Sequence, residues 1–200
     1  MGRNKKSADI EPPKSDKNNT LQYLTEFLTT AGQSDCLAIV GMKGTGKSSF
    51  ILKEFYEDKK NIVVVTPKAF KPMQIDKKHI VCNFYNFMKV PAEQLKDSAI
   101  IFDDCKYYLS SNPNATGTKH VIDILRMSRH QNNAVRLVFH SLNDVAPQMF
   151  ANIDKLLLFK TVSEIGKFAG IVPEYDTIKA AYIEVQANTN QYFCKLVDLR

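Results

Sequence analysis

The sequence has no closely spaced cysteine pair, no long apolar run and no apolar stretch directly after its basic N-terminal residues. Its four cysteines stand far apart, so no CxxC motif suggests zinc or redox chemistry, and they are typical of buried thiols in a reducing compartment: Cys36, Cys82, Cys105 and Cys194. The longest apolar runs, such as residues 36–40, fall far below the roughly 18 residues that span a bilayer. No apolar stretch follows the basic N-terminus, so we expect a protein that is neither secreted nor stably inserted in a membrane.

Arginine is scarce, and a guanine-reading Asn-Lys-x-Asp element is missing, which argues against a GTPase. Five arginines stand against 22 lysines, and the basic residues together exceed the acidic ones, 27 against 21, for a net charge of +6. This balance favours an acidic partner such as nucleic acid or an anionic surface, although many soluble proteins are equally basic. With 44% hydrophobic residues, the chain has enough apolar material for a core.

The chain of 200 residues corresponds to about one domain. Residues 1–19 hold five basic and three acidic side chains and few apolar ones. We expect a flexible basic tail there, either an unselected terminus or an arm for DNA or a partner surface. A single domain is expected over residues 20–200, and its first helix should begin at Thr20.

Short apolar runs of strand length alternate with helical segments along the rest of the chain. The runs are apolar throughout, which is typical of strands covered on both faces in a mostly parallel sheet: 36–40, 61–65, 80–84, 99–102, 135–139 and 156–159. Helices are expected at 48–58, 119–131, 145–153 and 176–186. The series predicts an α/β fold, a three-layer sandwich around a mostly parallel central sheet. Residues 192–197 could add a C-terminal edge strand.

A complete phosphate-binding motif follows the first predicted strand. The segment Gly41-Met42-Lys43-Gly44-Thr45-Gly46-Lys47-Ser48 matches G-x-x-x-x-G-K-[ST] and leads into a helix at Ser49. In such a loop, glycines let the backbone turn sharply and aim N–H groups at phosphate oxygens, and the helix adds its positive N-terminal end. Lys47 would reach the β- and γ-phosphates of a nucleoside triphosphate, and the Ser48 hydroxyl would coordinate Mg²⁺.

Two carboxylates follow the apolar run that ends at Phe102. Asp103 is expected to hold the magnesium ion, directly or through water, and Asp104 to polarise the attacking water. A strand that ends in Asp-Asp is often only a solvated turn. Because the same sequence also contains a phosphate loop, which requires a metal ligand and a base nearby, we interpret Asp103 as the metal ligand and Asp104 as the base.

Three of the five arginines lie between the acidic pair and the end of the next predicted strand. Arg126 and Arg129 are three residues apart on a predicted helix, so either could reach the γ-phosphate of a neighbouring subunit or form an ordinary ion pair. Arg136 belongs to the strand, where a structural role is expected. The strand is followed by His140 and Ser141, and either could sense the γ-phosphate or position water, whereas a structural histidine is the alternative.

In combination these features resemble the FtsK/HerA superfamily of DNA-pumping ATPases. The resemblance rests on residues 41–48, 100–104, 129–141 and 152–160, and it covers roughly residues 35–161. Within that superfamily, the small size is similar to the genome-packaging ATPases of tailless icosahedral double-stranded DNA viruses with internal membranes.

The resemblance implies an ASCE/RecA-like P-loop fold, ATP and Mg²⁺ as cofactors, and a homo-oligomeric ring, a pentamer or hexamer, around double-stranded DNA bound without reading its sequence. It also implies capsid vertex or portal proteins as partners, in the host cytoplasm or the virion. It implies that Lys47 and Ser48 bind ATP and Mg²⁺, that Asp103 holds the metal and that Asp104 is the catalytic base. It also implies that Arg129 or Arg126 is an arginine finger, which reaches the nucleotide of the neighbouring subunit, and that His140 or Ser141 is the polar sensor of the γ-phosphate. Two positions depart from the family, which normally has Glu at Asp104 and often Gln at the sensor position.

A segment that is polar from Ser110 onward, residues 105–120, connects the acidic pair with the arginine helix. We expect it to face the DNA channel, with Lys106, Lys119 and His120 contacting phosphates without reading bases, or else to be a plain surface loop. Two other functions stay open. One is a filamentous-phage-type assembly or secretion ATPase, which usually carries a transmembrane segment. The other is a monomeric small-molecule or nucleotide kinase, which shares the phosphate loop.

Overall fold

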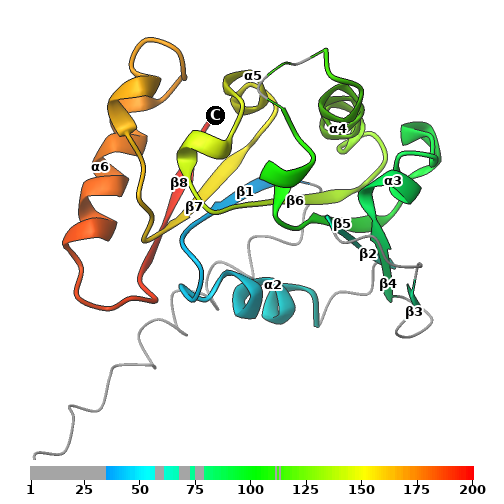
Figure 1. Cartoon of the computed structure of the whole chain (residues 1–200), viewed down its shortest axis with the longest axis horizontal. Helices are drawn as coiled ribbons and strands as arrows, with labels where there is room; N and C mark the ends of the chain where they lie inside the picture. The colour runs from blue at the N-terminus through cyan, green and yellow to red at the C-terminus, as the bar shows by residue number, and fades with distance from the viewer. Residues whose placement is uncertain (1–34, 57–60, 68–72, 75–78, 111, 113) are drawn as a thin grey trace, which may run out of the picture.

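The computed structural model describes residues 35–56, 61–67, 73–74, 79–110, 112 and 114–200. The tail expected over 1–19 and the helix expected from Thr20 lie outside the described residues. The described chain forms one eight-stranded sheet in the order β3-β4-β2-β5-β6-β1-β7-β8. Helix α2 covers one face of the sheet, and α3, α4 and α5 cover the other (Figure 1). The predicted α/β sandwich is confirmed.

The strands are β1 (Cys36–Val40), β2 (Asn61–Thr66), β3 (Met73–Gln74), β4 (His79–Asn83), β5 (Ser98–Phe102), β6 (Ala134–Phe139), β7 (Lys155–Phe159) and β8 (Cys194–Asp198). The α-helices are α2 (Lys47–Tyr56), α3 (Phe84–Phe87), α4 (Thr116–Met127), α5 (Pro147–Phe150) and α6 (Tyr175–Ala187). Short 3₁₀ turns are η1 (Ala92–Gln94), η2 (Cys105–Tyr107), η3 (Leu142–Asp144) and η4 (Ile165–Phe168).

The six inner strands of the sheet run parallel, and only the edge strands β3 and β8 run antiparallel. All six parallel strands therefore end at one edge of the sheet, which we call the carboxyl edge, and begin at the opposite amino edge. Strand β6 lies between β1 and β5. The predicted C-terminal edge strand is confirmed as β8, which pairs with β7.

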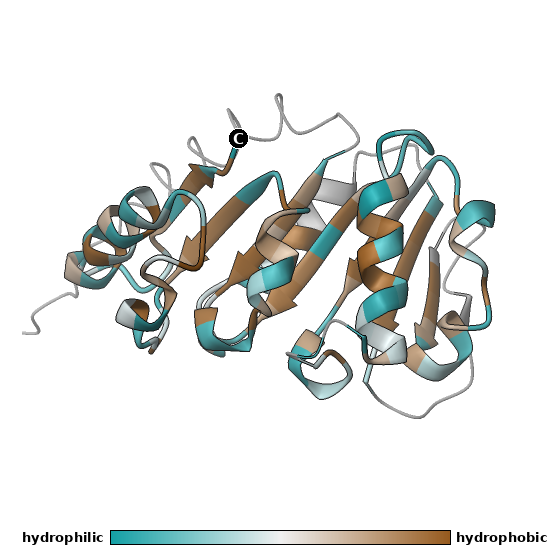
Figure 2. Cartoon of the chain, turned by 90° about the horizontal axis from the view of Figure 1, so that it is seen from above, coloured by the Kyte–Doolittle hydropathy of each residue, from teal (hydrophilic) through white to brown (hydrophobic). Residues whose placement is uncertain are grey.

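The central strands are apolar throughout because both of their faces are covered. In β1, Leu37 and Ile39 pack in the same cluster as Phe50 of α2, while Ala38 and Val40 face the larger cluster that includes α4. All five residues of β1 are buried. Figure 2 shows the same result as predominantly hydrophobic strands beneath helices that carry mixed hydropathy. Strands of this kind are typical of the interior of a parallel sheet.

Most predicted elements differ from those observed by one or more residues at an end, and three of them show a physical reason. The run 80–84 is β4 only to Asn83, because the Asn83 side chain accepts a hydrogen bond from Asn86 N (2.8 Å) and starts α3 at Phe84. The helix expected at 119–131 is α4, which ends at Met127, and the chain then turns through a left-handed Asn132 (φ 56°). The helix expected at 145–153 shortens to α5, because the chain must enter β7 directly afterwards. Within the described residues, no helix has both the length and the apolar character to cross a bilayer.

Candidate nucleotide-binding site

The phosphate loop, residues 41–48, joins the buried strand β1 to α2 at the carboxyl edge. Gly41 N donates a hydrogen bond to the Phe139 carbonyl (3.1 Å), and Met42 N donates one to the Lys160 carbonyl (2.8 Å). Phe139 ends β6 and Lys160 follows β7, so the loop is anchored to the strands on both sides of β1. A loop tied at both sides presents its backbone amides in a fixed arrangement, as phosphate binding requires.

Three glycines of the motif are needed for the shape of the loop. Gly44 (φ 84°) and Gly46 (φ 98°) adopt backbone conformations that other residues rarely take. Gly41 is needed for a different reason, since a Cβ there would lie 2.6 Å from Phe159 Cβ. The sequence motif therefore corresponds to real steric requirements in this structure.

Lys47 is buried, and its ammonium folds back over its own loop. Its Nζ donates hydrogen bonds to the carbonyls of Gly41 and Met42, the second at 2.9 Å. Burial lowers the pKa of Lys47, and the neighbouring carboxylates Asp104 and Asp103 act in the opposite direction. The Lys47 ammonium and the two carboxylates that follow β5 therefore interact electrostatically, although β6 lies between β1 and β5.

The outer side of the loop is open to solvent. Ser48 and Ser49 are exposed in the first turn of α2, and the Thr45 hydroxyl donates to the Met42 carbonyl (2.8 Å). An exposed Ser48 hydroxyl and the Asp103 carboxylate are hard oxygen donors of the kind Mg²⁺ prefers. Within the described residues, no group of three or more His, Cys, Asp or Glu side chains could hold a metal. A magnesium ion here would therefore need oxygens from outside these side chains, such as those of phosphate and water, to complete its coordination.

The acidic pair follows β5 at the same edge. Burial raises the pKa of Asp103, and the adjacent negative charge of Asp104 raises it further, while His140 and Lys47 act to lower it. Asp104 has a left-handed backbone (φ 50°, ψ 48°), which is uncommon for a residue with a side chain. Two adjacent carboxylates, one of them with a pKa raised by burial, are typical of a site maintained for chemistry rather than for stability.

His140 contacts the second carboxylate directly. Its Nε2 lies 2.6 Å from Asp104 Oδ1, and both side chains are about one-third exposed, at 30% and 33%. The main chain of His140 is held as well, because the Thr161 hydroxyl donates to its carbonyl (2.8 Å). The sequence predicted a polar residue after β6 near the phosphates, and the structure brings His140 to the acidic pair.

Ser141, the other sensor candidate, is engaged in local structure. Its hydroxyl donates to the Val162 carbonyl (3.0 Å) and lies 3.0 Å from Ser163 Oγ. It also caps the turn η3, where its backbone N–H donates to the Asp144 carboxylate (3.1 Å). Of the two candidates, His140 is the one in contact with the acidic pair.

Tyr108 was missed by sequence reasoning. Its hydroxyl donates to the backbone carbonyl of Asp103 (2.7 Å), and burial raises the pKa of this phenol well above its ordinary value. Its ring stacks on Phe84 of α3, with centroids 4.3 Å apart. Gly117 of α4 packs on the same ring, since a Cβ there would lie 2.8 Å from Phe84 Cε1. The only sequence signal was an aromatic pair soon after Asp-Asp.

The two finger candidates do not share a helix face. Arg126, in the last turn of α4, lies 3.7 Å from Asp123 and is 65% exposed. Arg129 lies beyond the end of the helix, where its guanidinium donates to Asp154 (3.0 Å). Asp154 also accepts a hydrogen bond from the first residue of β1, so Arg129 sits at the amino edge, opposite its own phosphate loop. Arg136 has the structural role expected, buried and paired with Asp35 (2.7 Å).

The three candidates for DNA contact divide into two groups. Lys106 and Lys119 are exposed, and the Lys106 ammonium lies 5.4 Å from the centre of the Tyr107 ring. His120 instead turns inward, because its Nε2 is buried without a hydrogen-bond partner and its ring lies 6.0 Å from that of Phe87. Burial lowers the pKa of His120. Its orientation does not support the expected contact with a DNA phosphate.

Together, the fold and the site define a P-loop nucleoside triphosphatase. A parallel sheet places a complete phosphate loop after β1, an acidic pair after β5 and a histidine after β6, all at one edge. Both carboxylates lie close enough to Lys47 to act on its pKa, which they raise against the larger effect of burial.

No protein-family model and no curated protein sequence matches this chain. Among solved structures, it is similar to B204, the DNA-packaging ATPase from Sulfolobus turreted icosahedral virus, with a TM-score of 0.64 and 17% identity over 84% of this chain and 94% of that one. The genome-packaging NTPase B204 from Sulfolobus turreted icosahedral virus 2, in complex with ATP-γS, gives 0.63 and 16% over 83% and 93%. EssC from Geobacillus thermodenitrificans gives 0.50 and 11% over 68% and 34%. The expected resemblance is thus confirmed at the level of the fold.

Proposed function

We propose that this chain is an ATP-hydrolysing translocase that packages double-stranded DNA into a viral capsid. The observation that carries the ATPase activity is the convergence of Lys47, Asp103 and Asp104, with His140 bonded to Asp104, at the carboxyl edge. The packaging role is supported by the likeness to B204, which spans 94% of that chain. The site alone would also fit other P-loop enzymes, so the two parts of the proposal need separate tests.

In the proposed reaction, water attacks the γ-phosphorus and the bond to the β,γ-bridging oxygen breaks. Lys47 and the loop amides stabilise the negative charge that develops on the phosphate oxygens. Ser48 and Asp103 would hold Mg²⁺, which would supply further positive charge at the phosphates. The proton of the attacking water passes to the pair formed by Asp104 and His140, which lie 2.6 Å apart. The imidazole orients a carboxylate that is one methylene shorter than the glutamate usual in such enzymes.

A ring would bring an arginine of one subunit to the nucleotide of the next. Arg129 is the better candidate, because it lies at the edge opposite its own phosphate loop and its side chain is 56% exposed. An arginine supplied in trans can raise the rate roughly 10³- to 10⁵-fold. Mixing Arg129→Ala subunits with Asp104→Asn subunits should restore part of the ATPase activity. Mixtures as inactive as the separate variants would refute the trans role. Arg126→Ala, which alters the other exposed arginine, is the matched control.

DNA contact is proposed for Lys106 and Lys119, near the two ends of the segment 105–120. Removing one lysine that binds a phosphate should reduce the slope of log binding constant against log salt by roughly 0.9. Lys119→Ala should therefore bind duplex DNA with a shallower salt dependence for every sequence tested. An unchanged slope would show that Lys119 does not contact a DNA phosphate. Lys167→Ala, which changes an exposed lysine paired with Glu164 elsewhere on the chain, is the control.

The function as a whole is tested by ATP hydrolysis with and without double-stranded DNA, together with the native mass in solution. We expect DNA to stimulate hydrolysis by a ring-sized assembly. Phosphoryl transfer to a small acceptor by a monomer would contradict the translocase and favour a kinase.

The place of action is proposed to be the host cytoplasm or the packaging vertex of the virion, with capsid vertex or portal proteins as partners. Detection of this chain in purified virions, bound to vertex proteins, would support that assignment. Its absence both from virions and from capsid assembly intermediates would contradict it.

A further inference from the structure

An exposed tyrosine lies directly beside the phosphate loop. Tyr192 belongs to the segment between α6 and β8, and it is 47% exposed. Its Cδ1 atom lies 3.5 Å from the position that a Cβ would take on Gly46. Gly46 immediately precedes Lys47 in the loop, so an aromatic ring from the far end of the chain borders the proposed polyphosphate site.

The topology of the sheet explains why the ring is there. Strand β7 runs parallel to β1 and therefore ends at the carboxyl edge. Strand β8 runs antiparallel to β7, with Cys194 opposite Phe159, so β8 must begin at that same edge. The segment that enters β8 consequently passes next to the turn between β1 and α2 (Figure 1). The C-terminal edge strand thus delivers Tyr192 to the phosphate loop.

Local hydrogen bonds hold the segment in place. Asn190 N donates to the Asn188 side chain (2.8 Å), and Tyr192 N donates to the Asn190 side chain (2.9 Å). Phe193 N then donates to the Asn190 carbonyl (3.1 Å). Successive turns of this kind restrict the backbone. The ring is therefore attached to a segment of defined shape before any ligand binds, which reduces the entropy that binding must remove.

Two aromatic side chains border Gly46, and they differ in burial. Phe159 Cε1 lies 3.9 Å from the same Cβ position, but Phe159 is a core residue with 3% exposure that packs edge-on against Phe50. Tyr192 covers the loop from outside and keeps nearly half of its surface in water. An exposed ring beside a phosphate loop is suited to stack on a flat ligand that is joined to the phosphates.

We propose that Tyr192 is the platform on which the base of the bound nucleotide stacks, and that it makes the site favour purine over pyrimidine nucleotides. This inference rests on the proposed function, since it requires a triphosphate in the loop 41–48. One ribose joins the base of a nucleotide to its α-phosphate, so the base must lie near the loop. Stacking tolerates any base because each has a π-face, and the larger purine rings gain more contact.

Binding constants measured by calorimetry separate the base from the phosphates. Tyr192→Ala should weaken ATP binding about tenfold, within the range found for base-aromatic stacking, and Tyr192→Phe should bind ATP nearly as well as the unaltered chain. Both variants should bind inorganic tripolyphosphate unchanged, because it has no base. Equal weakening for tripolyphosphate would show that the ring only supports the loop and would overturn the platform, as would unaltered ATP binding by Tyr192→Ala.

The absence of tryptophan from the chain supplies a second, direct measurement. In Tyr192→Trp, the single indole should be quenched by ATP and GTP, less by CTP, and not by tripolyphosphate. Tyr85→Trp, which alters a tyrosine of α3 that is 74% exposed, is the control and should respond to none of them. Equal responses to CTP and ATP would refute the purine preference. Binding of neither ATP nor tripolyphosphate by the unaltered chain would instead contradict the proposed function itself.

Discussion

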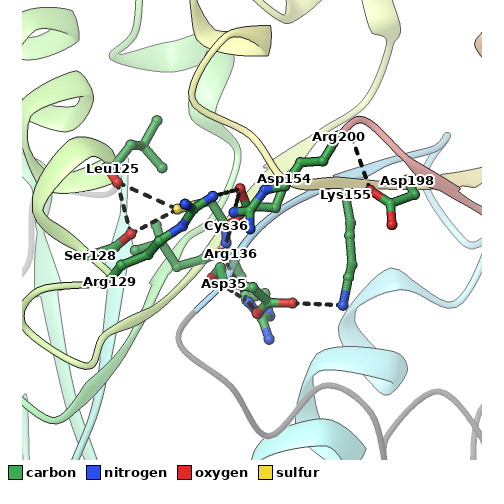
Figure 3. A network of polar contacts seen from close by, with 11 residues as sticks. Asp35, Cys36, Leu125, Ser128, Arg129, Arg136, Asp154, Lys155, Asp198 and Arg200 are labelled. Carbon is green, nitrogen blue, oxygen red and sulfur yellow. Dashed lines mark hydrogen bonds and ion pairs between the residues drawn. The ribbon is translucent and has the colours of Figure 1, made fainter. Parts of the chain in front are cut away.

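The two ends of the central strands carry charged clusters that are built in opposite ways. At the amino edge, carboxylates face cations: Asp35 pairs with buried Arg136 (2.7 Å) and with Lys155 (3.3 Å) (Figure 3). At the carboxyl edge, Asp103 stands beside Asp104, and burial together with the neighbouring charge raises the pKa of Asp103. The first cluster compensates charge, and the second places like charges together.

Asp154 extends the contrast at the amino edge. Its carboxylate accepts a hydrogen bond from Cys36 N (2.8 Å), pairs with Arg129 (3.0 Å) and contacts Arg200. The group therefore ties β7 to β1 and to the turn after α4. Lys47 at the other edge has its pKa lowered by burial instead. Charge content therefore does not identify the functional end of the sheet, whereas adjacent like charges do.

The largest effect is expected when the cation of the carboxyl edge is removed. Lys47→Ala should lower the rate of ATP hydrolysis by about 10²- to 10³-fold, because a fixed positive charge at the phosphates disappears. Its melting temperature should change little, because the loss of two hydrogen bonds to loop carbonyls is offset by the removal of a buried, desolvated ammonium. Steady-state hydrolysis and thermal unfolding measure the two effects. A Lys47→Ala variant that keeps its turnover would show that the carboxyl edge is not the functional end of the sheet.

The counterpart at the amino edge should show the reverse. Arg136→Met should reduce the free energy of unfolding by about 3 kcal/mol, because removal of a fully buried cation leaves Asp35 incompletely compensated. Turnover per folded molecule should stay near that of the unaltered chain. Urea unfolding and activity corrected for the folded fraction are the measurements. Arg136→Lys, which keeps the charge but loses the planar fork, should be intermediate, and a smaller loss for Met than for Lys would contradict this account.

Replacing an aspartate by asparagine should have opposite effects on stability at the two edges of the sheet. The folded pKa of Asp103 is raised above its unfolded value, so the folded state holds that proton more tightly and stability falls as pH rises from the unfolded pKa through the folded one. At neutral pH, Asp103→Asn should therefore stabilise the fold while abolishing turnover. Asp154→Asn should destabilise the fold by about 1–3 kcal/mol, since it weakens two arginine contacts and a hydrogen bond.

Melting temperatures of both variants across the acidic range test this. The advantage of Asp103→Asn should vanish below the unfolded pKa of the aspartate, where the natural side chain is also neutral. Destabilisation by both substitutions at neutral pH would show that the acidic pair is an ordinary structural element.

The smallest effect concerns the link between Tyr108 and the acidic pair. Tyr108→Phe keeps the stack on Phe84 and removes only the hydrogen bond to the Asp103 carbonyl, which should cost about 1 kcal/mol of stability. If the bond also fixes the carboxylates, kcat should fall while KM stays constant. A rise in KM with an unchanged kcat would assign Tyr108 to substrate binding instead.

Local sequence patterns predicted the phosphate loop and the strands well. The loop at 41–48 carries its geometry in its glycines, since Gly44 and Gly46 occupy conformations that other residues avoid. The buried strands were visible because both of their faces are covered, which leaves apolar runs such as β1. The burial of a strand and the backbone shape of a loop both depend on residues that are close together in the chain, so a single sequence carries the signal for each.

Pairings between distant residues could not be read from the sequence in the same way. Nothing in the spacing predicts that Arg129 contacts Asp154 or that the Tyr108 hydroxyl reaches the Asp103 carbonyl. The ring of His120 lies near that of Phe87, which belongs to another helix. These contacts depend on how elements pack, and periodicity within one element does not contain that information.

The central claim is that the carboxyl edge binds a nucleoside triphosphate with magnesium, and direct titration with Mg²⁺ and ATP-γS tests it most simply. Calorimetry should show saturable binding to the unaltered chain, weaker binding to Lys47→Ala, and unaltered binding to Arg129→Ala as an isolated subunit. Equal binding by Lys47→Ala and the unaltered chain would place the nucleotide elsewhere and contradict the account.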